Sequence, residues 1–151
     1  MSCSTQKNTY INRAFHSINT RYNGYFNGNE AFKEGIKIVE ENMEENYDSL
    51  PPIFLTDARI ATSKASEQFN KAISKAKKAI EKHSMFIQGV EYNWWVDDCY
   101  LLIGKSYFYL GQYDEALSYI DYARKISEDN DLKTEGATFH LLALLEKNEI
   151  E

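Results

Sequence analysis

Apolar residues recur every three or four positions through much of the chain, a period that predicts helices rather than strands. The first helix begins after Asn8 or Thr9, either of which can cap it. Its apolar stripe consists of Ile11, Phe15, Ile18, Tyr22 and either Tyr25 or Phe26. Residues 23–29 are rich in asparagine and glycine, which tolerate left-handed backbone angles, so a tight turn is expected there. A second helix from about Glu30 would complete a helical hairpin, with Phe32, Ile36, Val39 and Met43 as its stripe.

The helical period stops between residues 47 and 57. Pro51 and Pro52 forbid a helix across this point and predict an extended crossing. Asp57 can then cap a third helix that runs to about His83. The stripe of this helix consists of Ala61, Ala65, Phe69, Ala72, Ile73, Ala76 and Ile80. Residues 88–93 connect it to the next helical stretch.

Residues 97–130 carry the most specific spacing in the chain. In the first half Tyr100, Ile103, Gly104 and Tyr107 occupy one face, and Ala116, Ile120 and Ala123 follow in the second half. Small side chains at Gly104 and Ala116 let two antiparallel helices approach closely. Gly111 ends the first of these helices, and Tyr113 packs on the turn.

This stretch resembles a 34-residue tetratricopeptide repeat, although Glu128 stands where the repeat usually has proline. Ala65, Phe69 and Ala72 repeat the spacing of Ala116, Ile120 and Ala123, which marks the third helix as an elongated second-helix element and indicates degenerate internal repetition. One repeat leaves an apolar face uncovered, so neighbouring hairpins are expected. The predicted fold is therefore all-α, built of tetratricopeptide-repeat-like antiparallel helix hairpins with about six helices.

The last helix is expected after Asp131. It is apolar on too many sides for a solvent-facing end, through Ala137, Phe139, Leu141, Leu142, Leu144 and Leu145. Repeat arrays need polar caps, so we expect a following helix and interpret Glu151 as a boundary cut. The domain division is a flexible tether at residues 1–7 and a repeat-like helical domain at residues 8–151. Trp94 and Trp95 are adjacent and must point in different directions, so one is expected in the core and the other exposed as a candidate partner anchor.

Composition narrows the range of functions. The chain has 151 residues, a formal net charge of -6 and 43% hydrophobic residues, as a packed single domain needs. The acidic balance argues against a nucleic-acid partner. Six lysines between Lys64 and Lys82 are interpreted as a solvated helix face, with an anion site as the less favoured alternative. No run of 18 apolar residues and no signal peptide is present.

The two cysteines lie in different settings. Cys99 falls inside the first helix of the recognised repeat, where a small buried hydrophobe is favoured over a reactive thiol. Cys3 lies in a polar segment that would not bury it. Its surroundings are consistent with a disordered tail or a cloning remnant, and alternatively with the lipid attachment site of a bacterial lipoprotein.

Several segments together resemble the SprE/PorW lipoproteins of the type IX secretion and gliding machinery of Bacteroidetes. The resemblance rests on Cys3 to Asn8, on Arg21 to Gly35, on Leu50 to Phe54 and on Lys78 to Met85. It implies an N-terminal fragment of a longer lipoprotein at the periplasmic face of the outer membrane, with a lipid anchor on Cys3. It also implies a role in linking motor and translocon through contacts with other proteins of the secretion or gliding complex.

The triplet Asp48, Ser49, Leu50 is similar to the short acceptor for O-glycans in periplasmic proteins of the same phylum. The resemblance makes Ser49 a possible modification site, although three-residue matches often arise by chance.

Residues for catalysis or metal binding are not concentrated anywhere in the sequence. His16, His83 and His140 are far apart, and no metal-binding spacing, glycine-rich phosphate loop or nucleophile elbow occurs. We therefore expect no catalytic, metal or cofactor site, no cofactor and no small-molecule substrate. A hydrolase or modifying enzyme is the function class with the least support.

Two groups of residues are candidates for contact with a partner. The concave face of a repeat array is lined by first-helix residues, here Asp98, Leu101, Lys105 and Phe108. The second group consists of Arg21, Tyr22, Asn23, Phe26 and Asn27. For the second group, turn chemistry and core packing are a slightly favoured alternative. The helical repeats thus predict a non-enzymatic protein-interaction scaffold, and the resemblance implies that it acts in the secretion or gliding system. A generic peptide-binding repeat module is the alternative.

Overall fold

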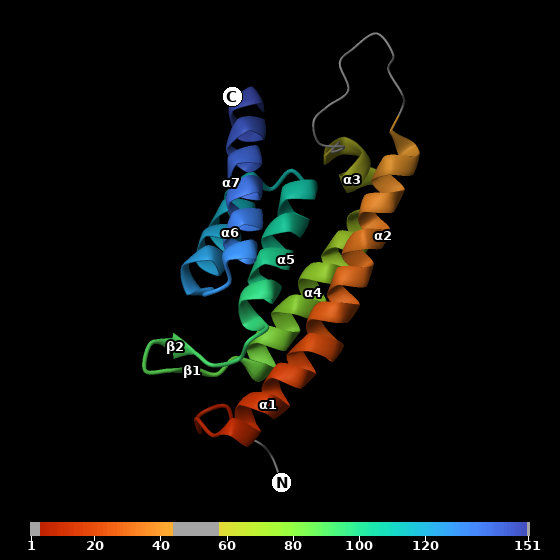
Figure 1. Ribbon diagram of the computed structural model, residues 1–151. Coiled ribbons are helices and arrows are strands. Elements are labelled where there is room, and N and C mark those ends of the chain that lie inside the picture. The colour runs from red at the N-terminus through yellow and green to blue at the C-terminus, as the bar shows by residue number, and fades with distance from the viewer. Residues whose placement is uncertain (1–3, 44–57, 151) are drawn as a thin grey trace.

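The computed structural model describes residues 4–43 and 58–150, and the described chain is all-α apart from one small hairpin (Figure 1). Its elements are α1 (Tyr10–Asn19), the π-helix η1 (Thr20–Phe26), α2 (Asn27–Asn42), α3 (Ala58–Lys64), α4 (Ser66–His83), β1 (Phe86–Ile87), β2 (Val90–Glu91), α5 (Val96–Tyr109), α6 (Tyr113–Ile126) and α7 (Asn130–Ile150). Because α1, η1 and α2 are continuous, the described residues form about six helices, which confirms the predicted fold class.

The N-terminal third of the chain is one long helix rather than the predicted hairpin. Thr9 caps it by accepting a hydrogen bond from the Asn12 amide at 3.3 Å, as expected. The predicted turn at residues 23–29 is wrong, because the backbone stays helical at both Thr20 (φ -62°, ψ -46°) and Asn27 (φ -66°, ψ -32°). The seven residues of η1 widen the helix locally without breaking it.

The glycines of this segment serve close packing between helices instead of a turn. A Cβ on Gly24 would lie 2.2 Å from the Cβ of Ala79, and one on Gly28 would lie 3.3 Å from the carbonyl oxygen of Ala72. Both contacts are on α4, which runs beside the long helix in Figure 1. The asparagine and glycine content therefore reflects a backbone approach that only a missing side chain permits.

Helix α2 pairs with α4, and the resulting hairpin forms the first half of the core. Ala65, where α3 and α4 meet, has a non-helical backbone (φ -118°, ψ 7°) that bends the predicted third helix into two. Gly35 lies against the ring of Phe69, which is fully buried between Phe32 and Tyr109. The predicted spacing of small and large residues on α4 thus faces α2.

Helices α5 and α6 form the second hairpin, as the spacing in residues 97–130 predicts. Gly104 lies against Ile120, and a Cβ there would also be 3.2 Å from the Ala116 carbonyl oxygen. Gly111 (φ +72°) ends α5, and the amides of Gly111 and Gln112 bond back to the carbonyls of Phe108 and Tyr107. This close approach and this helix end fit a tetratricopeptide-like hairpin.

Helix α7 covers α6 and part of α5 and leaves an apolar side exposed. Phe139 meets Phe108 edge to face at 5.5 Å, which closes the inner side of α5. Leu141, Leu144 and Leu145 remain exposed, as expected from the apolar residues on several sides of this helix. A following helix stays a prediction.

Candidate binding site

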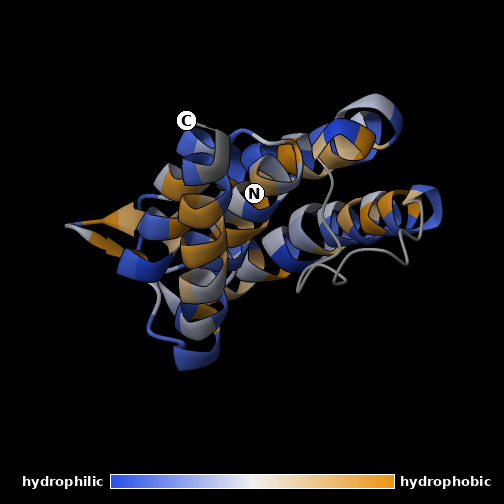
Figure 2. Cartoon of the chain, turned by 90° about the horizontal axis from the view of Figure 1, so that it is seen from above, coloured by the Kyte–Doolittle hydropathy of each residue, from blue (hydrophilic) through white to orange (hydrophobic). Residues whose placement is uncertain are grey.

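A cleft of about 530 Å³ lies between the β1–β2 hairpin and the junction of α6 with α7. We call it the hairpin cleft. It is lined by Phe86, Gly89, Val90, Glu91, Asn93, Trp94, Asp97, Tyr122, Lys125, Ile126, Glu128 and Asp129. Figure 2 shows the hairpin projecting beyond the helices with apolar residues on its strands. The sequence predicts only a plain connection over residues 88–93, so neither the hairpin nor the cleft was expected.

The hairpin is shaped by a two-residue turn and one carboxylate. Gln88 (φ 52°) and Gly89 (φ 85°) both have positive φ, the turn geometry that matches the twist of paired strands. Glu91 Oε1 accepts hydrogen bonds from the amides of Met85 at 2.7 Å and Asn93 at 2.9 Å. Its other oxygen accepts one from the Ser84 hydroxyl. Glu91 is therefore occupied in holding the hairpin, and it is not a free acid in the cleft.

Asn93 fastens the base of the cleft to the N-terminal helix. Its buried amide donates to the Thr20 hydroxyl at 2.7 Å and to the His83 carbonyl oxygen at 2.8 Å. Its own oxygen accepts from the Trp95 amide at 3.1 Å. Because every polar atom of the Asn93 side chain is used, this network fixes the position of the two tryptophans that follow.

Trp94 is exposed, as predicted, whereas Trp95 is half-buried and is not one of the core residues. Trp95 packs against Tyr25 at 5.2 Å and lies under the guanidinium of Arg21 at 4.9 Å. Trp94 keeps 57% of its surface exposed at the rim of the cleft, while its backbone amide donates to the Ser17 hydroxyl. The exposed indole is thus presented on a fixed backbone.

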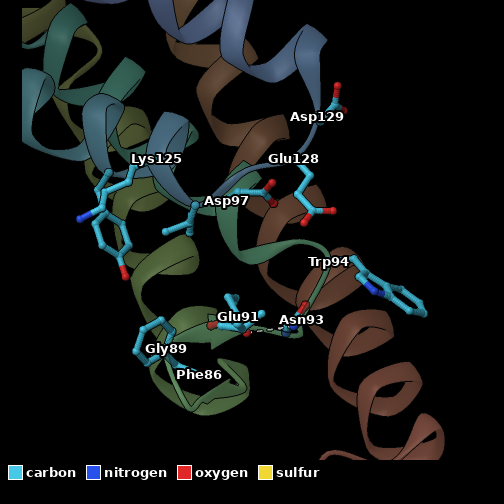
Figure 3. A pocket seen from close by; sticks show the side chains of 12 residues that line it. Phe86, Gly89, Glu91, Asn93, Trp94, Asp97, Lys125, Glu128 and Asp129 are labelled. Carbon is cyan, nitrogen blue, oxygen red and sulfur yellow. Dashed lines mark hydrogen bonds between the residues drawn. The ribbon is translucent and has the colours of Figure 1, made fainter.

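The cleft combines apolar walls with negative charge. Asp97, Glu128 and Asp129 stand on the side opposite the hairpin, and Lys125 is the one basic residue in the lining (Figure 3). Within the described ranges none of these three carboxylates forms a salt bridge. Phe86, Val90 and Tyr122 add exposed apolar surface. The arrangement suits a ligand that brings an apolar group together with a positive charge.

The negative charge extends inward to Asp98. Burial, and to a smaller extent the neighbouring carboxylates of Asp97 and Asp129, raise the pKa of the Asp98 carboxyl to about 7. Burial also raises the pKa of the Tyr25 hydroxyl to about 12, with Asp98 as the next cause. Asp98 therefore changes charge close to neutral pH, directly next in the chain to Asp97 of the cleft.

His16 and His83, far apart in sequence, lie in contact. Their Nδ1 atoms are 3.0 Å apart, so one ring donates an N–H and the other accepts it. Burial lowers the pKa of His83, and the neighbouring His16 and Lys82 lower it further. In the part of the chain that the structure describes, no group of three or more His, Cys, Asp or Glu side chains could hold a metal ion. The pair joins α1 to the end of α4, a contact that spacing alone could not indicate.

The four predicted partner residues on α5 do not share one exposed surface. Leu101 and Phe108 are buried, so they belong to the core and not to an open binding face. Asp98 is partly buried, and Lys105 donates to Glu135 at 2.6 Å while its ammonium lies over the ring of Phe32. The expected open concave face on α5 is closed by α2 and α7 because aromatic rings from both helices pack on it.

The second group is brought together on the outer side of the long helix. Tyr22 and Phe26 are exposed there, and Arg21 stacks on the rings of Tyr22 and Trp95. Asn23 donates to Asn19, and Asn27 donates to the carbonyl oxygens of Tyr22 and Asn23. Tyr22 and Phe26 are therefore not core residues, so the alternative of core packing does not apply to these two side chains.

Other predicted features have simpler outcomes. Cys3 and Ser49 lie outside the described residues, as do Pro51 and Pro52. Cys99 is buried and its thiol pKa is raised by that burial, which confirms the hydrophobic interpretation. Among the helices of residues 4–43 and 58–150, none is both long and apolar enough to cross a lipid bilayer.

No family model matches the chain, and no curated protein matches it. The likeness to secretion and gliding lipoproteins therefore stays a prediction that rests on the residues quoted for it.

Proposed function

We propose that this chain is a non-enzymatic scaffold that binds other proteins, and that the hairpin cleft is one of its binding surfaces. The observation that carries the proposal is the exposed Trp94 on a rigid backbone beside a cleft of about 530 Å³. Tryptophan is the residue type most enriched among side chains that dominate binding energy at interfaces. A partner segment with an apolar side chain and a nearby lysine or arginine complements the cleft.

The cellular setting that we propose follows the resemblance. The chain would belong to an outer-membrane lipoprotein at the periplasmic face, anchored through Cys3, that links motor and translocon components of a type IX secretion or gliding system. A fold made largely of packed helix hairpins supports a scaffold role, since such arrays bind proteins along their surfaces.

A generic peptide-binding repeat module is the alternative. The size of the hairpin cleft favours it, because a cavity of about 530 Å³ suits a few side chains of an extended peptide. The buried Leu101 and Phe108 argue against the usual groove on the first helix of a repeat. Any peptide would therefore bind at the hairpin and not along α5.

A crosslinked pulldown from the native cell envelope tests the proposal. The full-length protein would be compared with Cys3→Ala, Trp94→Ala and the matched control Leu141→Ala, which alters an equally exposed apolar residue far from the cleft. We expect secretion-motor and translocon components with the unaltered protein. Trp94→Ala should lower their recovery strongly, because truncating such an anchor costs about 2 kcal/mol or more of binding free energy.

The outcomes separate the candidates. Loss of membrane partners with Cys3→Ala supports the anchored bridge. Recovery of short peptides alone, reduced by Trp94→Ala and unaffected by Cys3→Ala, favours the peptide module. Equal recovery with Trp94→Ala and Leu141→Ala would remove the hairpin cleft as the binding surface.

A further inference from the structure

The long N-terminal helix carries a row of apolar side chains on the side away from the core. We call it the outer row. It consists of Ile11, Phe15, Ile18, Tyr22 and Phe26. Between 44% and 73% of the surface of each is exposed. The opposite side of the same helix meets the core through small and polar residues, namely His16, Ser17, Thr20, Gly24 and Gly28. The apolar stripe found in the sequence is therefore not the side that folds against the rest of the chain.

The π-helix keeps the outer row aligned. The first four members are spaced by four, three and four residues, which in an undistorted helix would bring Tyr25 next into line. A π-helical turn holds more residues than an α-helical one, so Phe26 takes that place. Tyr25 instead points inward to Trp95, with ring centroids 5.2 Å apart. One local distortion thus serves both the core and the exposed row.

The row is narrow, and its two edges differ. One edge carries Arg13 and Arg21, which stack on Tyr92 at 4.5 Å and Trp95 at 4.9 Å. Along the helix, Asn19, Asn23 and Asn27 follow one another at every fourth position and bond to each other or to the backbone. A single row of apolar residues between polar neighbours is the seam that a second helix fits, whereas a membrane-bound helix needs a wider apolar face.

Charge identifies the kind of helix that fits the row. Residues 4–29 contain Lys7, Arg13 and Arg21 and no aspartate or glutamate, although the whole chain has a net charge of -6. Two copies of the chain paired through this row would place arginine near arginine. A partner with carboxylates flanking its apolar stripe is attracted instead.

We propose that the outer row is a docking site for an acidic amphipathic helix of a partner protein. The inference rests on the proposed scaffold role and names the partner chemistry for a second surface, separate from the hairpin cleft. The proposals for the hairpin cleft and for the outer row can fail separately, because a helical peptide that tests the outer row does not test binding at Trp94.

The test uses two synthetic helical peptides with the same leucine stripe. One has glutamates beside the stripe and the other has lysines at the same positions. Each carries a fluorophore and is titrated with the full 151-residue chain while fluorescence anisotropy is recorded. The protein variants are Ile18→Asp and the matched control Leu141→Asp, which alters a similarly exposed residue on α7. Far-UV circular dichroism checks that both variants fold.

We expect the glutamate peptide to bind at least about tenfold more tightly than the lysine peptide. Ile18→Asp should weaken binding of the glutamate peptide by about tenfold or more, since an apolar contact is lost and a charge of the same sign as the peptide's is added. Leu141→Asp should change its affinity by less than about twofold.

Three results would overturn the inference. Equal affinity for the two peptides, or no binding of either, removes the acidic helix as the occupant. Sedimentation of the chain with phosphatidylglycerol vesicles, lost in Ile18→Asp and stronger than peptide binding, assigns the row to a membrane surface. A dimer in light scattering that Ile18→Asp converts to a monomer assigns it to a second copy.

Discussion

The hairpin of α2 with α4 and the hairpin of α5 with α6 use the same contact in different settings. In each, a glycine of the first helix lies against a large residue of the second, Gly35 against Phe69 and Gly104 against Ile120. In each, alanines stand four residues before and three residues after that large residue. The second hairpin is closed by the short turn at Gly111, whereas residues 43–65 separate the helices of the first. The contact between helices therefore persists without the short turn.

The large residues of the two hairpins, Phe69 and Ile120, differ in which other helices they contact. Phe69 stacks on Tyr109 of α5 at 5.2 Å and meets Phe32 at 5.8 Å, so it joins the two hairpins. Ile120 is equally buried but contacts its own hairpin and Gly136 of α7. The aromatic residue thus serves as the link between the two halves of the core.

The largest expected effect comes from truncating these two residues. Phe69→Ala should lower the free energy of unfolding by about 4 kcal/mol, and Ile120→Ala by about 3 kcal/mol, because each leaves a cavity in a packed core. Urea denaturation followed by circular dichroism measures both. A smaller loss for Phe69→Ala than for Ile120→Ala would contradict the linking role of Phe69.

A smaller effect is expected from adding a methyl group at the glycines. Gly104→Ala places a Cβ 2.6 Å from Ile120 Cγ1 and 3.1 Å from its backbone nitrogen, so α5 and α6 must separate. We expect a loss of about 2 kcal/mol, since overpacking outweighs the gain of about 1 kcal/mol in helix propensity. Gly35→Ala meets the buried Phe69 ring at 2.9 Å and should lose a similar amount.

Gly136→Ala is the matched control. It is also a helical glycine, but the nearest atoms are the Cγ and Cδ of Arg124, which belong to a flexible side chain at the surface. It should be neutral or stabilise the protein by up to about 1 kcal/mol. Equal destabilisation by all three substitutions would show that the close approach of helices is not the cause.

The comparison also shows what the sequence could predict. The second hairpin was predicted because its contact residues and its turn lie within one 34-residue unit of known spacing. In the first hairpin the spacing on α4 was found, but its partner was misassigned, because Gly24 and Gly28 are equally suited to a turn and to close packing. Local sequence does not distinguish these two uses.

The binding surfaces were harder to predict for a related reason. The hairpin cleft joins residues 86–97 to residues 122–129, and His16 meets His83 across 67 positions, so both depend on how helices pack. Helical period identified the stripe from Ile11 to Phe26 but could not show that it faces outward. The inner side of that helix uses glycine, serine, threonine and histidine, which a search for apolar residues overlooks.

The last expected effect concerns pH, which should act on the two hairpins with opposite sign. His83 ends α4, and its lowered pKa means that the unfolded chain binds a proton more readily below about pH 6.5. Its contribution to the free energy of unfolding is therefore lost as pH falls below that value. Asp98 in α5 has its pKa raised from 3.8 to about 7, so the folded chain holds that proton longer. Stability from this group is present at low pH and is lost as pH rises from about 4 to about 7.

Asp98→Asn removes the pH dependence that comes from Asp98 and leaves the pH dependence that comes from His83. The variant should be more stable than the unaltered protein at about pH 8. The difference should vanish only as pH falls well below about 4, where Asp98 becomes protonated in the unfolded chain as well as in the folded one. Urea midpoints measured at one-unit steps of pH give both curves. The remaining slope of the variant then reports the histidine pair, and His83→Gln should flatten it near pH 6. The difference in free energy of unfolding between Asp98→Asn and the unaltered protein could instead stay constant from about pH 8 to about pH 4. Burial of the Asp98 charge would then not be the cause of the different pH dependence of the two hairpins.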